Sequence, residues 1–219
     1  MSGGPAAPQQ ERSRRSAQQI LAAAVDVLTA DGIADFTMSS VSELAGLSVG
    51  GVYGRFPNKQ SLLREVKNEV LTELEEAIAE RLAAVGESGG GPAEVLEAFV
   101  TGLSEHLYAR TRLFAFVFLQ SADDAVMRRR GFDFHQRMKD ALRDALAPYP
   151  IEPAGPGEAD RIDVVYEVVV QSITIRAVSA GTIADGERTY RSVPGWRQYA
   201  AELTEIALLY LTSPPRRSS

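Results

Sequence analysis

Residues 37–56, TMSSVSELAGLSVGGVYGRF, form the stretch that decides the fold of this chain. Thr37 and Ser48 are each placed to cap a helix, because a short hydroxyl side chain can accept a hydrogen bond from an unpaired amide of the first turn. Gly46 lies between the two segments and tolerates the left-handed backbone that often ends a helix. Pro57 cannot continue the second helix. The pattern predicts a helix, a short turn and a second helix, the plan in which the second helix enters the major groove of DNA.

Apolar positions at helical spacing support the same interpretation. In the first segment, Val41, Leu44 and Ala45 are expected to share one face. The second helix is predicted over 49–56, where the apolar side is formed by Val52, Tyr53 and Phe56. A preceding helix is predicted over 13–30, because apolar residues recur there every three or four positions. Three helices would then form a small N-terminal domain.

This segment resembles the N-terminal module of the TetR family of repressors. The resemblance covers about residues 12 to 66. It is carried by Thr37, Val41, Ala45, Gly46, Leu47, Ser48, Gly50, Val52, Tyr53, Phe56, Lys59, Leu62 and Leu63. Two positions depart from the family pattern, since Ser42 replaces a small apolar residue and Gly51 replaces a Thr or Ser. The resemblance implies an all-α fold, with a three-helix DNA-binding domain containing a helix-turn-helix and a C-terminal helical bundle for ligand binding and dimerisation.

The pattern and the resemblance together predict a DNA-binding surface. Its residues are Arg15, Thr37, Ser39, Ser48, Val49, Gly50, Gly51, Tyr53, Arg55 and Lys59. The resemblance implies phosphate contacts for Tyr53 and Lys59, while Arg55 can donate to guanine or to phosphate. Three alternatives stay open: Tyr53 in the core, the paired glycines as a poorly packed first turn, and Arg15 as part of a solvated helix start.

The distribution of charge agrees with a DNA-binding N-terminus. The 219 residues carry a net charge of −6, yet the first 63 residues hold five basic and five acidic side chains, so the whole excess lies beyond residue 63. An acidic remainder would keep the protein from coating DNA non-specifically. The chain has no Cys, which excludes disulfides and thiolate chemistry and fits a cytoplasmic location.

The chain divides into four parts. We expect a disordered tail over 1–11, the DNA-binding domain over 12–58, the ligand-binding and dimerisation domain over 59–213, and a second disordered tail over 214–219. The large domain should contain a long helix over 59–84, a flexible loop over 86–92, and a buried helix over 113–119. The next helix, capped by Asp123 and Asp124, is expected to turn Val126 inward and Arg128, Arg129 and Arg130 outward.

The last two helices, predicted over 158–183 and 194–212, carry more apolar residues than one modest surface requires. The resemblance implies that they pair with a second subunit as a four-helix bundle. A two-fold dimer would place two recognition helices on a palindromic operator. Packing within one chain is the alternative. Because Asp163, Glu167 and Arg176 interrupt the apolar run over 162–184, we expect a buried helix and no membrane span.

Aromatic residues in the large domain predict a pocket for a small-molecule effector, since ligand pockets are mostly apolar with a few polar groups. The candidates are Phe99, Leu103, His106, Phe114, Phe118, Phe134, His135, Met138, Tyr166 and Arg176, although many of the aromatic and apolar residues here must simply be core. Arg176 is expected to pair with Glu167, Glu202 or Glu205, or with an acidic ligand. The two histidines lack metal-ligand spacing and nucleophile partners, so no catalytic residue, metal or cofactor is expected.

The leading hypothesis is a ligand-responsive transcriptional repressor that leaves its operator when an apolar or aromatic molecule binds the C-terminal domain. One alternative is a DNA-bound regulator controlled by a protein partner and not by a small molecule. Another is a helical enzyme or carrier with a vestigial DNA module. The sequence does not distinguish a repressor from an activator.

Overall fold

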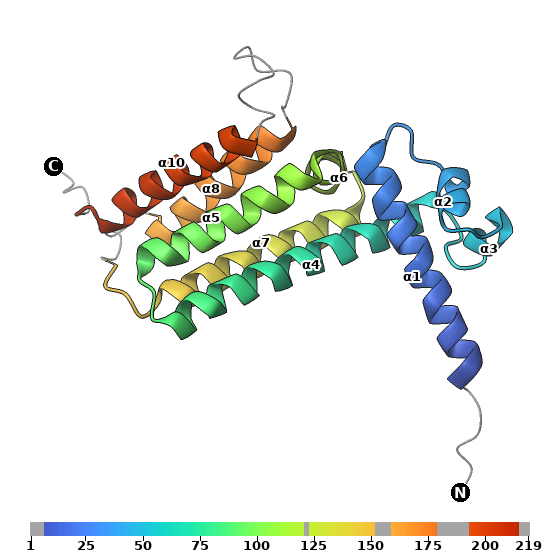
Figure 1. Ribbon diagram of the computed structural model, residues 1–219, viewed down its shortest axis with the longest axis horizontal. Helices are drawn as coiled ribbons and strands as arrows, with labels where there is room; N and C mark the ends of the chain where they lie inside the picture. The colour runs from blue at the N-terminus through green and yellow to red at the C-terminus, as the bar shows by residue number, and fades with distance from the viewer. Residues whose placement is uncertain (1–6, 121–122, 152–158, 179–192, 215–219) are drawn as a thin grey trace, which may run out of the picture.

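The computed structural model describes residues 7–120, 123–151, 159–178 and 193–214, and every element within these ranges is helical (Figure 1). The prediction of an all-α fold is therefore confirmed. The tail positions 1–6 and 215–219, the loop positions 152–157 and the predicted helical positions 179–183 lie outside the described residues. Among the residues that are described, no helix combines the length and apolar composition that crossing a bilayer requires.

Three helices form the N-terminal domain: α1 (Ala7–Ala30), α2 (Met38–Leu44) and α3 (Val49–Tyr53). They enclose a small core to which α1 contributes Ile20, Ala24 and Leu28, all without exposed surface. α2 and α3 close this core with Val41 and Val52, which are equally buried. These side chains recur at helical spacing, as the sequence requires for helices that share one core.

The first helix begins earlier than expected. It starts at Ala7, within the segment predicted to be a disordered tail. Glu11 supports this first part of the helix, because its carboxylate lies 3.1 Å from a guanidinium nitrogen of Arg14 and 3.2 Å from one of Arg15. Ion pairs at this spacing add a few tenths of a kcal/mol each to a helix.

A long helix, α4 (Lys59–Ser88), leads from the N-terminal domain into the body. Asn58 caps it by accepting a bond from the Ser61 amide at 2.8 Å. The helix is longer than predicted and is capped at its C-terminus by Gly89, whose φ of 70° is the left-handed conformation that favours glycine. Much of the expected flexible loop over 86–92 is consequently helical.

The centre of the body is α5 (Pro92–Ala109), which contacts α4, α8 (Arg161–Val178) and α10 (Val193–Thr212). α5 approaches α4 closely at Gly102, where a Cβ would lie 2.7 Å from Cδ1 of Ile78. In Figure 1, α4 runs along one edge of the body, α10 along the opposite edge, and α5 between them. The body therefore consists of packed helices that run nearly parallel to one another.

Two short elements follow α5: α6 (Thr111–Ala115) and a π-helical turn, η1 (Phe116–Gln120). The prediction of a buried helix over 113–119 holds for Leu113, Phe114, Phe116 and Val117, which are at most 2% exposed. It is wrong at Leu119, which is 48% exposed. Figure 1 shows α6 beside the C-terminal end of α1, so this turn joins the body to the N-terminal domain.

The helix α7 (Ala125–Leu146) packs along α4, and two of its residues differ from expectation. Val126 is 56% exposed and does not point inward. Arg130 was expected to face solvent, but it lies 2.8 Å from the carboxylate of Glu75 on α4, with its side chain 14% exposed. The reason is helical geometry: Arg130 follows Met127 by three residues and precedes Phe134 by four, so it shares their buried face.

Candidate functional site

The helix-turn-helix formed by α2 and α3 is built by local hydrogen bonds. Thr37 Oγ1 accepts a bond from the Ser40 amide at 3.0 Å, while the Thr37 amide donates to Ser40 Oγ at 3.2 Å. Gly46 has a φ of 63° and ends the first helix. Ser48 Oγ accepts from the Gly51 amide at 3.1 Å and begins the second. Both predicted caps are confirmed, and the helix-turn-helix follows from residues within a few positions of one another.

The two sides of α3 have opposite environments. Val52 is 0% exposed and Phe56 is 7% exposed, so this side closes the core of the N-terminal domain. We call the opposite side, formed by Val49, Gly50 and Tyr53, the outer face of α3. Val49 is 41% exposed and Tyr53 is 47% exposed, which rules out the alternative of a core tyrosine. The outer face is therefore partly apolar, has no side chain at Gly50, and carries the phenol of Tyr53 at its end.

The predicted basic residues occupy different settings. Arg15 is exposed on α1 and pairs with Glu11, and Arg55 is exposed after α3 with its guanidinium donating to Ser13 Oγ of α1. Lys59 instead turns toward the domain, because its ammonium donates to the Phe36 carbonyl at 2.6 Å and lies 5.2 Å from the centre of the Phe36 ring. A phosphate contact from Lys59 would require this ammonium to exchange or share its bond to the carbonyl.

Neighbouring polar residues complete the surface. Ser39 and Thr37 are exposed at the start of α2, as a phosphate contact requires. Ser42, the departure from the family pattern, is buried, but its hydroxyl donates to the Ser39 carbonyl at 2.8 Å and so keeps a hydrogen bond. Leu44, the last residue of α2, was expected on the buried face of its helix, yet it is 56% exposed.

A contact that the sequence did not predict holds this module to α1. Gln19 Nε2 donates to the Ala45 carbonyl at 2.7 Å, across 26 positions of the chain. Its donation satisfies a carbonyl left free at the end of α2. The sequence carries no local signal for such a bond, since Gln19 lies on an ordinary polar position of α1.

Most of the predicted ligand-binding residues lie together as packed core. The ring centres of Phe114 and Phe118 are 5.8 Å apart, and those of Phe118 and Phe134 are also 5.8 Å apart. The series continues through His135 to Tyr166 at 6.1 Å and from Tyr166 to Phe99 at 6.0 Å. We call these six side chains the aromatic cluster. Leu103 and Met138 are buried as well, at 1% and 2% exposure.

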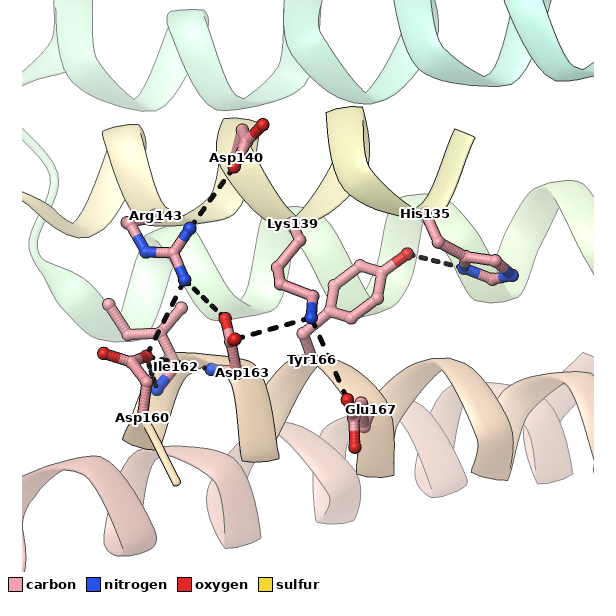
Figure 2. A network of polar contacts seen from close by, with 9 residues as sticks. All are labelled: His135, Lys139, Asp140, Arg143, Asp160, Ile162, Asp163, Tyr166 and Glu167. Carbon is pink, nitrogen blue, oxygen red and sulfur yellow. Dashed lines mark hydrogen bonds and ion pairs between the residues drawn. The ribbon is translucent and has the colours of Figure 1, made fainter. Parts of the chain in front are cut away.

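His135 and Tyr166 form the polar centre of this cluster, between α7 and α8 (Figure 2). His135 Nδ1 lies 2.8 Å from the Tyr166 hydroxyl. Burial lowers the pKa of His135, and the nearby charges of Lys67 and Lys139 lower it further. Burial, with a contribution from Glu167, raises the pKa of Tyr166 well above its ordinary value. Both groups are therefore neutral near pH 7 and can exchange hydrogen bonds with a neutral polar ligand atom.

The rest of the network in Figure 2 joins α7 to α8 by ion pairs. Arg143 lies 2.5 Å from Asp163, whose other oxygen is 3.5 Å from the ammonium of Lys139. Lys139 also lies 3.8 Å from Glu167. Asp160 caps α8 by accepting from the Ile162 amide at 2.9 Å. These contacts fix the two helices that bear His135 and Tyr166.

Two predicted pocket residues lie apart from the aromatic cluster. His106 Nδ1 is 2.8 Å from the Gly102 carbonyl of its own helix. Arg176 is buried against two rings, with its guanidinium carbon 5.3 Å from the centre of Trp196 and 4.2 Å from that of Tyr199. The structure thus places this cation on aromatic faces, where ring quadrupoles stabilise it.

A buried amine near the cluster had no signal in the sequence. Lys67 of α4 is 5% exposed, and burial, reinforced by the charge of Arg130 and opposed by that of Asp124, lowers its pKa to about 8. From the sequence alone, a lysine in a helix with many charged residues is expected to lie on the surface. Only the packing of α7 on α4 makes it an interior group.

An apolar groove runs between α8 and α10. Its volume is about 250 Å³. It is lined by Val164, Val165, Val168, Val169, Leu203, Ile206, Ala207 and Tyr210. Val168 is 46% exposed and Ile206 is 58% exposed, so large apolar side chains stand at the rim of the groove. An exposed apolar strip of this kind marks an interaction surface.

Comparison with known proteins confirms the resemblance to the TetR family for the N-terminal domain. Residues 20–66 match the family model of bacterial regulatory proteins, tetR family. The HTH-type transcriptional regulator BetI of Stenotrophomonas maltophilia (strain R551-3) is 34% identical over 85 residues, which span 39% of this chain and 42% of BetI. The aligned part is thus less than half of that relative. Both matches are to transcriptional regulators.

Solved structures share the whole fold. A candidate TetR-family regulator from Mesorhizobium loti MAFF303099 superposes with a TM-score of 0.69 at 16% identity, covering 90% of this chain and 96% of that one. FadR from Bacillus subtilis, solved in complex with stearoyl-CoA, gives a TM-score of 0.60 at 17% identity, covering 89% of this chain and 97% of FadR. At such identities the likeness establishes the fold alone.

Proposed function

We propose that this chain, whose N-terminal domain is of the TetR family, is a DNA-binding transcriptional regulator that acts in the cytoplasm. The observation that carries the proposal is the outer face of α3. The other side of α3 is buried in the domain core through Val52 and Phe56, while Val49, Gly50 and Tyr53 stay exposed. A helix held in this way can enter a major groove with its backbone close to the bases.

The residues around α3 divide into two roles. Thr37, Ser39, Ser48, Tyr53 and Lys59 position the domain by phosphate contacts, which carry no sequence information. Arg55, Val49 and the two glycines reach the base edges, where an arginine can donate two bonds to guanine. Arg15 adds charge from α1 near the same surface.

The regulator works as a homodimer through α8 and α10. The apolar groove between these helices, with Val168 and Ile206 at its rim, would be covered by the same surface of a second copy. Two-fold symmetry then presents two copies of α3 to successive half-sites, so the operator is a palindrome.

The regulator is a repressor that a small apolar or aromatic molecule releases from DNA. The aromatic cluster supplies apolar rings with two neutral polar groups, the composition of a ligand site. FadR, which shares the fold, binds stearoyl-CoA. Release requires that the ligand bind the DNA-free form more tightly than the DNA-bound form.

A second candidate is control by a protein partner. The dense packing of the aromatic cluster favours it, because Phe99, Phe114 and Phe134 are at most 1% exposed and leave little room unless the helices move. Binding of small molecules to the purified protein would decide between the two.

The experiment is selection of duplexes from a random pool, followed by titration of the selected site at several salt concentrations. Affinity should fall steeply with salt. Lys59→Ala should weaken binding to all sequences equally, and Arg55→Ala should change which sequence is preferred. Arg129→Ala, on the exposed side of α7, serves as the control and should bind like the parent. A pool without enrichment, or equal binding by all four proteins, would overturn the proposal.

A further inference from the structure

A cavity of about 620 Å³ lies where the N-terminal domain meets the body. Its wall includes Thr29 near the end of α1, Tyr108 and Arg110 at the end of α5, Arg112 and Ala115 of α6, and Trp196 of α10. None of the ten residues predicted from sequence to bind a ligand is among its described lining residues. Its volume falls within the range of small-molecule sites. The cavity touches α1, so an occupant would contact both parts of the protein.

The described lining is cationic. It contains two arginines and no carboxylate. Arg110 is already neutralised, because its guanidinium forms two bonds to Glu73 at 3.0 and 3.1 Å. Arg112 is exposed and donates to a neutral acceptor, the carbonyl of Ala30. No ion pair of Arg112 occurs among the described residues, so its charge is available to an anion.

Another part of the wall is aromatic. The rings of Tyr108 and Trp196 lie 5.5 Å apart with an interplanar angle of 56°. Trp196 is only 4% exposed, so it offers an edge and not a whole face. Ala115 and Ala177 also line the cavity, and their small side chains leave space in it. An aromatic ring of a ligand can pack against the accessible parts of Tyr108 and Trp196, and a negative group on that ligand fits Arg112.

We propose that this cavity binds an aryl carboxylate, with the carboxylate on the Arg112 guanidinium and the ring against Tyr108 and Trp196. The proposal rests on the proposed function, places its effector in this cavity and not in the aromatic cluster, and names the chemical class of that effector. A guanidinium matches a carboxylate with two parallel donors, and such charge-assisted bonds are about twice as strong as bonds to neutral acceptors.

Arg112 also explains how binding would reach the DNA-binding domain. Its bond to Ala30 satisfies a carbonyl of the last turn of α1, where a cation is also favoured by the helix dipole. Gly32, with a φ of 78°, lies against the aliphatic part of Arg112, since a Cβ there would be 3.8 Å from the Arg112 Cβ. A carboxylate that draws the guanidinium from Ala30 therefore loosens the joint between α6 and α1.

The chain supplies its own probe, because Trp196 is its one tryptophan. Fluorescence of the full-length protein is titrated with benzoate and 3-phenylpropionate, and with benzamide and 3-phenylpropionamide as neutral analogues. The carboxylates should give a saturable change, and the amides should bind at least about tenfold more weakly. Arg112→Gln should lower carboxylate affinity at least tenfold and leave amide affinity unchanged, while Arg129→Gln on α7 should match the parent.

A second variant covers the case in which Arg112→Gln does not fold. Ala115→Phe fills the cavity and should abolish the fluorescence change for every ligand, with the helical circular dichroism unchanged. No saturable change in the parent, or equal carboxylate affinity in Arg112→Gln and Arg129→Gln, would overturn the site.

Titration of the selected duplex separates this proposal from the proposed function. With a true site, carboxylate should weaken DNA binding by the parent and not by Arg112→Gln. DNA binding without carboxylate binding would defeat the site alone, whereas carboxylate binding without DNA binding would defeat the proposed function alone.

Discussion

Gly50→Ala is the substitution that most directly tests how α3 is used. Gly50 lies in α3, is exposed, and has no heavy atom of the protein within 4 Å of the position that a Cβ would take. Its backbone is not in the left-handed region, so alanine introduces no strain there. If Gly50 is needed for folding, the variant should lose stability. If it is needed for close approach to DNA, the variant should gain stability and lose affinity.

The expected stability change is small and favourable. Alanine is better than glycine in a helix interior by about 1 kcal/mol, and we expect about half of that in a helix as short as α3. For a protein of this size the melting temperature should rise by about 1–2 °C. In the complex with DNA, the added methyl group would lie on the outer face of α3, between the helix backbone and the DNA. It should weaken DNA binding at least about tenfold.

The assay combines thermal unfolding by circular dichroism with titration of the selected duplex. Gly86→Ala is the matched control, because Gly86 is also exposed in a helix, α4, with no heavy atom within 4 Å of its Cβ position. It lies far along α4 from the DNA-binding domain and should raise stability without altering affinity. Parent-like or tighter DNA binding by Gly50→Ala would refute the close approach of this residue to DNA.

Four further outcomes are expected. Thr37→Ala removes the cap of α2 and should cost about 1 kcal/mol of unfolding free energy in urea titrations. Because burial lowers the pKa of His135 below its ordinary 6.5, the unfolded chain binds the proton before the folded chain does. Stability should therefore be lost as the pH falls below about 6.5, and His135→Gln should flatten this part of the stability profile. Arg130→Ala should cost about 2 kcal/mol, because its charged bonds to α4 are mostly buried, whereas Arg129→Ala, with a 74% exposed side chain, should be nearly neutral in the same titrations. Ile206→Glu should leave a monomer in sedimentation or light scattering, and a persistent dimer would contradict the assignment of α8 and α10 as its interface.

The parts of the fold predicted from sequence share a physical origin. The caps of Thr37, Ser48 and Asn58 and the stop at Gly46 depend on hydrogen bonds and backbone angles within four residues. The inward positions of α3 follow from helical spacing in the same way. Even the error at the end of α4 was local, since Gly89 and not Gly86 adopts the left-handed conformation.

The tertiary structure decided what depends on contacts between distant segments. The crossing of α7 on α4 turns Arg130 inward and buries Lys67, although both read as surface cations. Packing in the body gathers the aromatic residues into a filled cluster and leaves an open cavity elsewhere, beside Arg112 and Trp196. Local patterns determine which residues form each helix and which face turns inward. Only the crossing of helices, through contacts dozens of residues apart, determines where space remains.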